Sequence, residues 1–192
     1  RFSIQGEYSV NLIKAAFDKP VSDHIAPEVA PVRPPLMCAG CPHRALFYLL
    51  NKLKKTVIGD IGCYTLGSLP PTSAMDTCLC MGASISMAHG FEKARGKDYA
   101  KNLVAVIGDS TFFHSGITGL INMSYNDCPG TVLILDNRIT GMTGHQQNPS
   151  TGKNARGEAA YAVDIPALAA ACGARSIREV DPFDLKDLEA AI

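Results

Sequence analysis

The sequence of 192 residues has no tryptophan, few aromatic side chains and no net charge, because 18 basic residues balance 18 acidic ones. Balanced charge provides no basic surface for a nucleic acid or an anionic membrane, so neither class of partner is expected. No apolar run approaches the roughly 20 residues of a membrane-spanning helix. Polar residues also interrupt residues 1–17, which therefore do not form a secretion signal. We expect a soluble, cytoplasmic protein.

Cysteine, by contrast, is abundant: the chain has seven, an odd number at irregular spacing. Without a secretion signal, such a set argues against a disulfide framework and favours metal or redox chemistry. The chain also opens without methionine and stops at Ile192 inside an expected helix. We therefore expect it to be part of a longer polypeptide.

Two regions differ in composition. Repeated prolines over residues 1–36 predict an extended interdomain linker arm, because proline fixes its own backbone and restricts its predecessor. Residues 37–192 alternate helical patterns with apolar runs such as "NLVAVIGD" and "GTVLILDN", typical of strands covered on both faces. This alternation predicts one α/β domain, truncated at its C-terminus: a doubly wound, mostly parallel sheet of about five or six strands with helices on both faces. Residues 175–180 are the last predicted strand.

A long glycine-rich loop follows the second of these apolar runs. Residues 138–158, "RITGMTGHQQNPSTGKNARGE", exceed the length that a compact domain usually tolerates, which indicates a functional or a mobile loop. Within it, Lys153 and Arg156 are candidates to attract a carboxylate, and a solvated loop is the alternative.

Oxygen-bearing side chains follow both apolar strands. Gly108-Asp109-Ser110 ends one strand and Asp136-Asn137 ends the other, separated by residues 111–135. In an open parallel sheet, ligands sit at the carboxyl ends of the strands, so these side chains can converge on one hard cation such as Mg²⁺. Gly108 permits close backbone approach, and the helix expected near Ser115 directs free N–H groups toward an anion. The alternative is that Asp109 and Ser110 only cap that helix.

This spacing resembles the signature of thiamine diphosphate enzymes, normally Gly-Asp-Gly and, after a similar gap, Asn-Asn. Ser110 replaces the last glycine and Asp136 the first asparagine. The resemblance implies that Asp109 and Asn137 bind Mg²⁺ through their side chains and that Ile139 offers its backbone carbonyl. It also implies that Gly108, Ser110 and Thr111 face the diphosphate of the cofactor. Residues 37–192 would then be the diphosphate-binding domain.

Three cysteines form a second constellation. Cys38 and Cys41 lie in "MCAGCPHRAL", and Cys63 follows a strand end in "GDIGCYTLGSLPP". Thiolates in this arrangement suit zinc or an iron–sulfur cluster. A Cys-x-x-Cys on its own is equally consistent with a redox dithiol or with two small core residues.

These stretches, together with "DTCLCMGASISMAHG", are similar to the 2-oxoacid:ferredoxin oxidoreductases, and specifically to indolepyruvate ferredoxin oxidoreductase alpha subunits. The resemblance implies a [4Fe–4S] cluster on Cys38, Cys41 and Cys63, with a fourth cysteine beyond Ile192. It also implies cofactor contacts for four residues near these motifs: Cys63, Tyr64, Gly82 and Ala83. Helix packing is the alternative for the last two. His114 and His145, beside the two metal-binding turns, are candidates to meet substrate, although no catalytic residue is assigned.

By this resemblance, the function is oxidative decarboxylation of an aryl pyruvate such as indolepyruvate. Thiamine diphosphate and Mg²⁺ are the cofactors, coenzyme A accepts the acyl group and ferredoxin accepts the electrons. A pyrimidine-binding domain of the same polypeptide and a beta subunit complete an oligomer, so the chain should be inactive alone. Two alternatives remain: a non-redox thiamine diphosphate-dependent decarboxylase or synthase, and a zinc-stapled, non-catalytic binding module.

Overall fold

The computed structural model describes residues 8–21 and 31–192, which belong to two compact units, 1–34 and 35–192. In the first unit, residues Val10–Ala16 form the helix α1, whose first turn is capped by the Ser9 hydroxyl accepting a hydrogen bond from the Leu12 N–H at 3.1 Å. The predicted linker arm was expected to be extended, so this helix is a difference. The rest of that arm, residues 1–7 and 22–30, lies outside the described residues.

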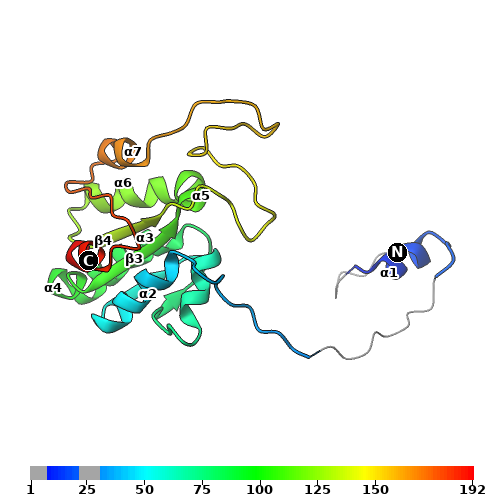
Figure 1. The fold of residues 1–192 in the computed structure, drawn as a ribbon, viewed down its shortest axis with the longest axis horizontal. Helices are drawn as coiled ribbons and strands as arrows, with labels where there is room; N and C mark the ends of the chain where they lie inside the picture. The colour runs from blue at the N-terminus through cyan, green and yellow to red at the C-terminus, as the bar shows by residue number, and fades with distance from the viewer. Residues whose placement is uncertain (1–7, 22–30) are drawn as a thin grey trace. The chain divides into compact units, whose positions relative to one another are not determined.

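A parallel sheet forms the centre of the second unit. Figure 1 shows β3 and β4 side by side in this sheet. The full strand order is β2-β1-β3-β4, and every neighbouring pair is parallel. The strands are β1 (Thr56–Gly59), β2 (Thr77–Cys78), β3 (Leu103–Gly108) and β4 (Thr131–Leu135). All six residues of β3 are buried, as its continuous apolar sequence predicts for a strand covered on both faces.

Helices cover both faces of this sheet. The sequence-predicted helices correspond to α2 (His43–Lys52), α3 (Ala83–Arg95), α6 (Ile117–Tyr125), α7 (Ile165–Ala171) and α8 (Leu185–Ala191). Shorter elements are α4 (Lys97–Ala100), α5 (Asp109–Thr111), the 3₁₀ helix η1 (Cys63–Ser68) and the π-helical turn η2 (Phe112–Gly116). None of the helices within residues 8–21 and 31–192 is long and apolar enough to cross a membrane.

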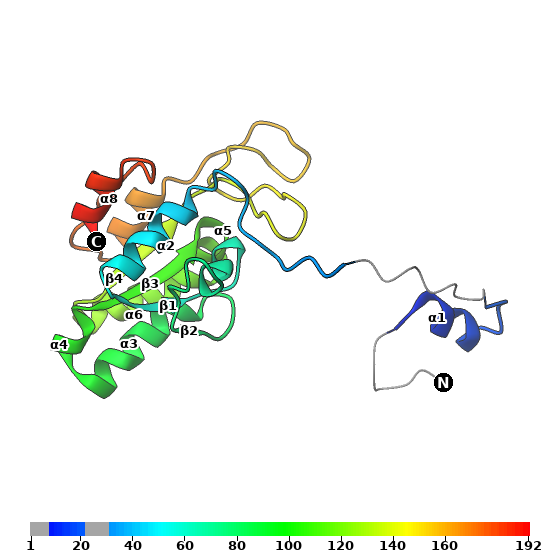
Figure 2. The same cartoon turned by 60° about the horizontal axis from the view of Figure 1, so that its bottom comes forward.

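Alternate residues of β3 point into two separate cores. Ala105 and Ile107 pack with residues of α3, α6 and α7, whereas Val104 and Val106 pack with residues of α2 and α8. In Figure 2, α2 and α8 accordingly lie on one side of the strands and α3 and α6 on the other. The predicted doubly wound α/β fold is thus confirmed.

The strand count differs from the prediction of five or six. Four strands form in the part of the chain that the structure describes, and residues 175–180 do not pair with the edge strand β4. Arg175 and Arg178 instead direct their guanidinium groups to the carboxylates of Asp127 and Asp187, and Ile177 is exposed. An apolar pattern predicts a strand only where neighbouring side chains bury it, and here they do not.

Candidate functional site

The carboxyl ends of β3 and β4 lie side by side. The two strands are in register with Gly108 opposite Leu135, so the next residues, Asp109 and Asp136, are also neighbours. Directly after β3 the chain turns into α5, which lies at this end of the sheet in Figure 1, and then into η2. The geometry therefore brings together the two segments whose spacing the sequence singles out.

Asp109 is a buried acid, with only 2% of its surface exposed. Its Oδ2 accepts a hydrogen bond from the Asn148 amide at 2.9 Å, and its Oδ1 accepts one from the Ser110 N–H at 2.8 Å. Burial raises the pKa of Asp109, the adjacent Asp136 raises it further, and the two hydrogen bonds oppose this shift. Among the described residues, the buried Asp109 carboxylate has no cationic partner of its own, and the neighbouring Asp136, which is exposed, has only the Arg138 guanidinium at 3.8 Å. Two adjacent carboxylates offer the oxygen ligands that a divalent cation prefers, so the residues fit the implied Mg²⁺.

The turn after β4 uses side-chain oxygens to fix its backbone. Asp136 Oδ1 accepts from the Arg138 N–H at 3.0 Å, and Asn137 Oδ1 accepts from the Ile139 N–H at 3.1 Å. Arg138 has a positive φ of 54°, which lets the chain reverse at this point. The sequence predicted Asn137 as a metal ligand. In the structure, Asp136 is the residue that contributes a second negative charge beside Asp109.

The Tyr64 ring packs against the backbone of the turn that begins at Gly108 and Asp109. A Cβ atom on Gly108 would lie 2.6 Å from the ring carbon Cε1 of Tyr64, so only glycine fits there. The Tyr64 hydroxyl donates to the Ile61 carbonyl at 2.9 Å, and burial raises its pKa to about 12. The predicted cofactor-contacting residue Thr111 is also buried, and its hydroxyl lies 3.5 Å from that of Tyr64.

The long loop of residues 138–158 is attached to the same turn. Thr140 Oγ1 donates to Ser110 Oγ at 2.8 Å, and Asn148 reaches Asp109. The Asn148 side chain is itself oriented, because its Oδ1 accepts from both the N–H and the hydroxyl of Ser150. Sequence reasoning missed Asn148, since one asparagine in a polar loop carries no distinguishing signal.

Asp60 is a second buried acid that sequence reasoning missed. Both of its carboxylate oxygens accept from the Gly82 N–H at 2.9 Å, and Oδ2 also accepts from the Ser84 N–H at 3.2 Å. It therefore caps the N-terminus of α3, where Gly82 and Ala83 were predicted to contact the cofactor. A signal did exist, because Val-Ile-Gly-Asp ends β1 at residues 57–60 just as it ends β3 at residues 106–109.

Gly82 also lies against the π-helical turn η2, which follows Asp109 in the chain. It has a φ of 86°, and a Cβ there would lie 2.3 Å from the Ser115 hydroxyl oxygen. The start of α3 and the turn η2 therefore touch at a residue where a side chain would not fit. His114, next in the chain to Ser115, is exposed, with its Nδ1 at 2.9 Å from Ser115 Oγ.

The three predicted cluster cysteines lie in one neighbourhood. Burial raises the pKa of the half-buried Cys63 thiol, and the nearby Cys41 and Cys38 raise it further. A Cβ on Gly141, in the long loop, would lie 3.2 Å from Cys63 Sγ, so Cys63 also borders the segment after β4. All seven cysteines are free thiols.

These cysteines do not surround a single point. Across residues 8–21 and 31–192, no three His, Cys, Asp or Glu side chains are grouped closely enough to hold one metal ion. That arrangement gives no support to the zinc-stapled module, which needs four ligands about one ion. A four-iron cluster spreads its thiolates around a larger body, so the separation of the sulfurs is not an objection to it.

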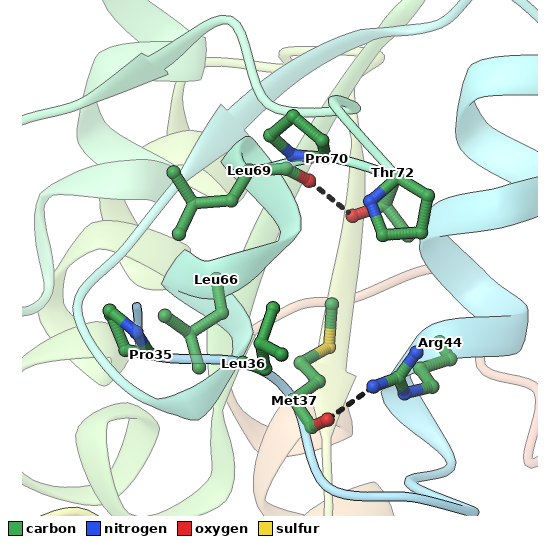
Figure 3. Close-up of a pocket in the computed structure, with 9 residues that line it drawn as sticks. Pro35, Leu36, Met37, Arg44, Leu66, Leu69, Pro70 and Thr72 are labelled. Carbon is green, nitrogen blue, oxygen red and sulfur yellow. Dashed lines mark hydrogen bonds between the residues drawn. The ribbon is translucent and has the colours of Figure 1, made fainter. Parts of the chain in front are cut away.

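Arg44 fixes the segment that carries Cys38. Its Nε donates to the Cys38 carbonyl at 2.9 Å and its Nη2 donates to the Met37 carbonyl, as Figure 3 shows for the second bond. Beside it is a cavity of about 10 Å³, lined by Pro35, Met37 and Leu66 among others, with room for about one water molecule. The Arg44 side chain therefore holds the Cys-x-x-Cys turn in place through hydrogen bonds to backbone carbonyls of that segment.

His145, the other candidate to meet substrate, is exposed in the long loop and has a φ of 61°. Among the described residues, neither His114 nor His145 makes a hydrogen bond or ion pair to Asp109 or Asp136. Both histidines are thus close in sequence to the turns predicted to bind the metal, but the structure does not bring them onto the carboxylates.

Comparison with known proteins gives consistent matches. Residues 60–192 match the family model "Thiamine pyrophosphate enzyme, C-terminal TPP binding domain", thiamine pyrophosphate being another name for thiamine diphosphate. The chain is 42% identical over 164 residues to indolepyruvate oxidoreductase subunit IorA of Archaeoglobus fulgidus, covering 83% of this chain and 26% of that protein. IorA of Pyrococcus horikoshii is 41% identical, with the same coverage. The chain thus spans about a quarter of the length of these relatives.

Solved structures agree on the fold. The 2-oxoglutarate:ferredoxin oxidoreductase from Magnetococcus marinus aligns with a TM-score of 0.66 at 20% identity, over 82% of this chain and 58% of that one. Benzoylformate decarboxylase from Polynucleobacter necessarius aligns with a TM-score of 0.53 at 19% identity, over 94% and 36%. At these identities the likeness concerns the fold alone.

Proposed function

The chain belongs to the thiamine pyrophosphate enzyme family, and we propose that it is the part of a 2-oxoacid:ferredoxin oxidoreductase that holds the diphosphate end of the cofactor. The proposed substrate is an aryl pyruvate such as indolepyruvate, since relatives 40–42% identical to the chain are named indolepyruvate oxidoreductase subunits. Coenzyme A is the proposed acyl acceptor and ferredoxin the electron acceptor.

The adjacency of Asp109 and Asp136 is the observation that carries this proposal. Asp109 is a buried carboxylate without a cationic partner in the described part of the chain, and Asp136 beside it has only the Arg138 guanidinium at 3.8 Å, so a divalent metal at this edge of the sheet would neutralise the buried charge. Asp109, Asn137 and the Ile139 carbonyl would hold Mg²⁺. Gly108, Ser110 and Thr111 would contact the diphosphate, and Gly82, Ala83, Cys63 and Tyr64 would border the cofactor.

Bound thiamine diphosphate would supply the nucleophilic carbon and the electron storage that the reaction requires. The chain's own residues would perform the positioning. Asn148 orients the Asp109 carboxylate toward the strand ends, and the bond between Thr140 and Ser110 holds the long loop against the same turn. The buried Tyr64 ring fills the space next to Gly108, which excludes water from the backbone of the turn.

Cys38, Cys41 and Cys63 would hold a [4Fe–4S] cluster as the first electron acceptor. Their shared neighbourhood supports this role, and so does the contact between Cys63 and the loop after β4. We propose that a fourth cysteine, the pyrimidine-binding domain with its acidic partner for the cofactor, and a beta subunit come from outside these residues. The whole assembly would be an oligomer.

The test is an assay of the anaerobically purified protein that contains this chain, together with its partner subunit, on indolepyruvate and other 2-oxoacids. Coenzyme A-dependent reduction of ferredoxin, with iron and acid-labile sulfide in the protein, is the expected result. Release of an aldehyde without an electron acceptor would replace the proposal with the non-redox decarboxylase. Zinc without iron, and no turnover, would favour the binding module.

A further inference from the structure

The long loop borders an open hollow of about 660 Å³ whose charged side chains are all positive. It is lined by His145, Gln147, Asn148, Lys153 and Arg156 among others, and none of its lining residues is acidic. Its size falls within the range of small-molecule sites. We call this cavity the basic hollow.

Lys153 and Arg156 belong to one turn, and both line the hollow. Lys153 and Ala159 form an antiparallel bridge, and between them Asn154 Oδ1 accepts from the N–H groups of Arg156 and Glu158 at 2.9 and 3.1 Å. Glu158 is the acidic residue of this turn. Its carboxylate accepts a hydrogen bond from the Asn154 side-chain amide at 2.8 Å rather than pairing with either cation. In the described part of the chain, neither Lys153 nor Arg156 has an ion-pair partner within 4.0 Å.

Holding two like charges in one turn raises the electrostatic free energy of the loop unless an anion joins them. Lysine and arginine in such a position are the side chains that bind phosphate and carboxylate groups through charge-assisted hydrogen bonds.

The basic hollow is also connected to the metal-binding turn. Asn148 forms part of its wall, and the same side chain donates to the Asp109 carboxylate at 2.9 Å. A ligand in the hollow would therefore lie one side chain away from Asp109.

We propose that the basic hollow binds the anionic group of a second ligand beside thiamine diphosphate, a phosphate or a carboxylate held by Lys153 and Arg156. This inference rests on the proposed function, which supplies two sources of that chemistry. One is the phosphates of coenzyme A, and the other is the carboxylate of the 2-oxoacid.

Calorimetric titration of the full protein that contains this chain, assembled with its partner subunit, with coenzyme A, dephospho-coenzyme A and phenylpyruvate, in low salt with EDTA and without thiamine diphosphate, distinguishes the sources. Tighter binding of coenzyme A than of both other probes assigns the hollow to its 3′-phosphate. Equal binding of the two coenzyme A forms, with none of phenylpyruvate, assigns it to the diphosphate. Binding of phenylpyruvate alone assigns it to the carboxylate, and binding of no probe overturns the proposal.

The double variant Lys153→Gln with Arg156→Gln removes the two cations, and Lys101→Gln with Lys186→Gln removes the same charge elsewhere on the surface. We expect the first variant to bind the recognised probe about tenfold more weakly or worse, and the control to bind it as the wild type does. Equal losses of affinity in the two double variants would indicate non-specific electrostatic attraction and would contradict the proposed binding site. Circular dichroism confirms that both variants are folded.

A further titration separates this inference from the proposed function. If neither the chain nor the assembly with its partner binds thiamine diphosphate with Mg²⁺, the proposed function fails, whatever the hollow binds. If thiamine diphosphate binds and none of the three anions does, only the hollow is wrong.

Discussion

The side-chain amide of Asn148 donates a hydrogen bond of 2.9 Å to the buried carboxylate of Asp109, which lies 39 positions earlier in the chain. The direction of the amide is fixed, because its oxygen already accepts two hydrogen bonds from Ser150. A loop residue thus determines how the carboxylate at the end of β3 is presented.

Asp109→Asn should abolish Mg²⁺-dependent binding of thiamine diphosphate, because it removes the buried negative charge of the proposed metal site. Calorimetry of the assembled protein measures the effect, with Asp98→Asn, a fully solvated acid on α4, as the matched control. Retained affinity in Asp109→Asn would remove the metal assignment.

Asn148→Ala should lower the free energy of unfolding by about 1 to 3 kcal/mol, since it leaves a buried carboxylate oxygen without its donor. The loss should also raise the pKa of Asp109 further, because this hydrogen bond favours the charged form. Urea denaturation of the variant and of Asn102→Ala, whose amide bonds a surface carbonyl, measures the difference. Equal stability of the two would show that the Asp109 contact contributes nothing.

Tyr64 should make stability depend on pH in alkaline solution. Its folded pKa of about 12 lies above the ordinary 10.0, so the neutral phenol stabilises the fold fully below pH 10 and that contribution is lost as pH rises through 12. The size of the contribution is about 3 kcal/mol, at 1.36 kcal/mol per unit. Unfolding free energies of Tyr64→Phe should fall less steeply across this range than those of the wild type. Tyr125→Phe, at an exposed position, should follow the wild type.

Cys63→Ser should reduce the iron and acid-labile sulfide of the anaerobically purified assembly to a small fraction of the wild-type content, because a hydroxyl is a poor ligand for a cluster. Cys172→Ser is the control, since this thiol is buried against α7 and the core around Met123. Full iron content in Cys63→Ser would eliminate Cys63 as a cluster ligand.

The sequence was sufficient for the fold and for the edge of the sheet that carries the site. Continuous apolar strands followed by Asp109 and by Asp136-Asn137 predicted two neighbouring strand ends, and β3 and β4 are indeed paired. The prediction of a strand at residues 175–180 was wrong because the side chains of the described residues do not bury that segment, and Ile177 stays exposed.

The roles of individual acids were less predictable. Asp60 and Asp109 end identical Val-Ile-Gly-Asp segments, but one meets the N–H groups that begin α3 and the other meets a second strand end. That difference arises from what lies opposite each carboxylate in three dimensions. Asn148 could not be found for the same reason, since its partner is distant in sequence.

Tyr64 has a consequence for the spacing of the two proposed sites. Its ring touches Gly108, the residue before Asp109, and its backbone continues directly from Cys63. One aromatic side chain therefore lies between the cysteine loop and the turn proposed to bind the metal. Because the ring is buried and packs against Gly108, in the proposed enzyme it would hold the cysteine loop and the proposed metal-binding turn at a fixed separation.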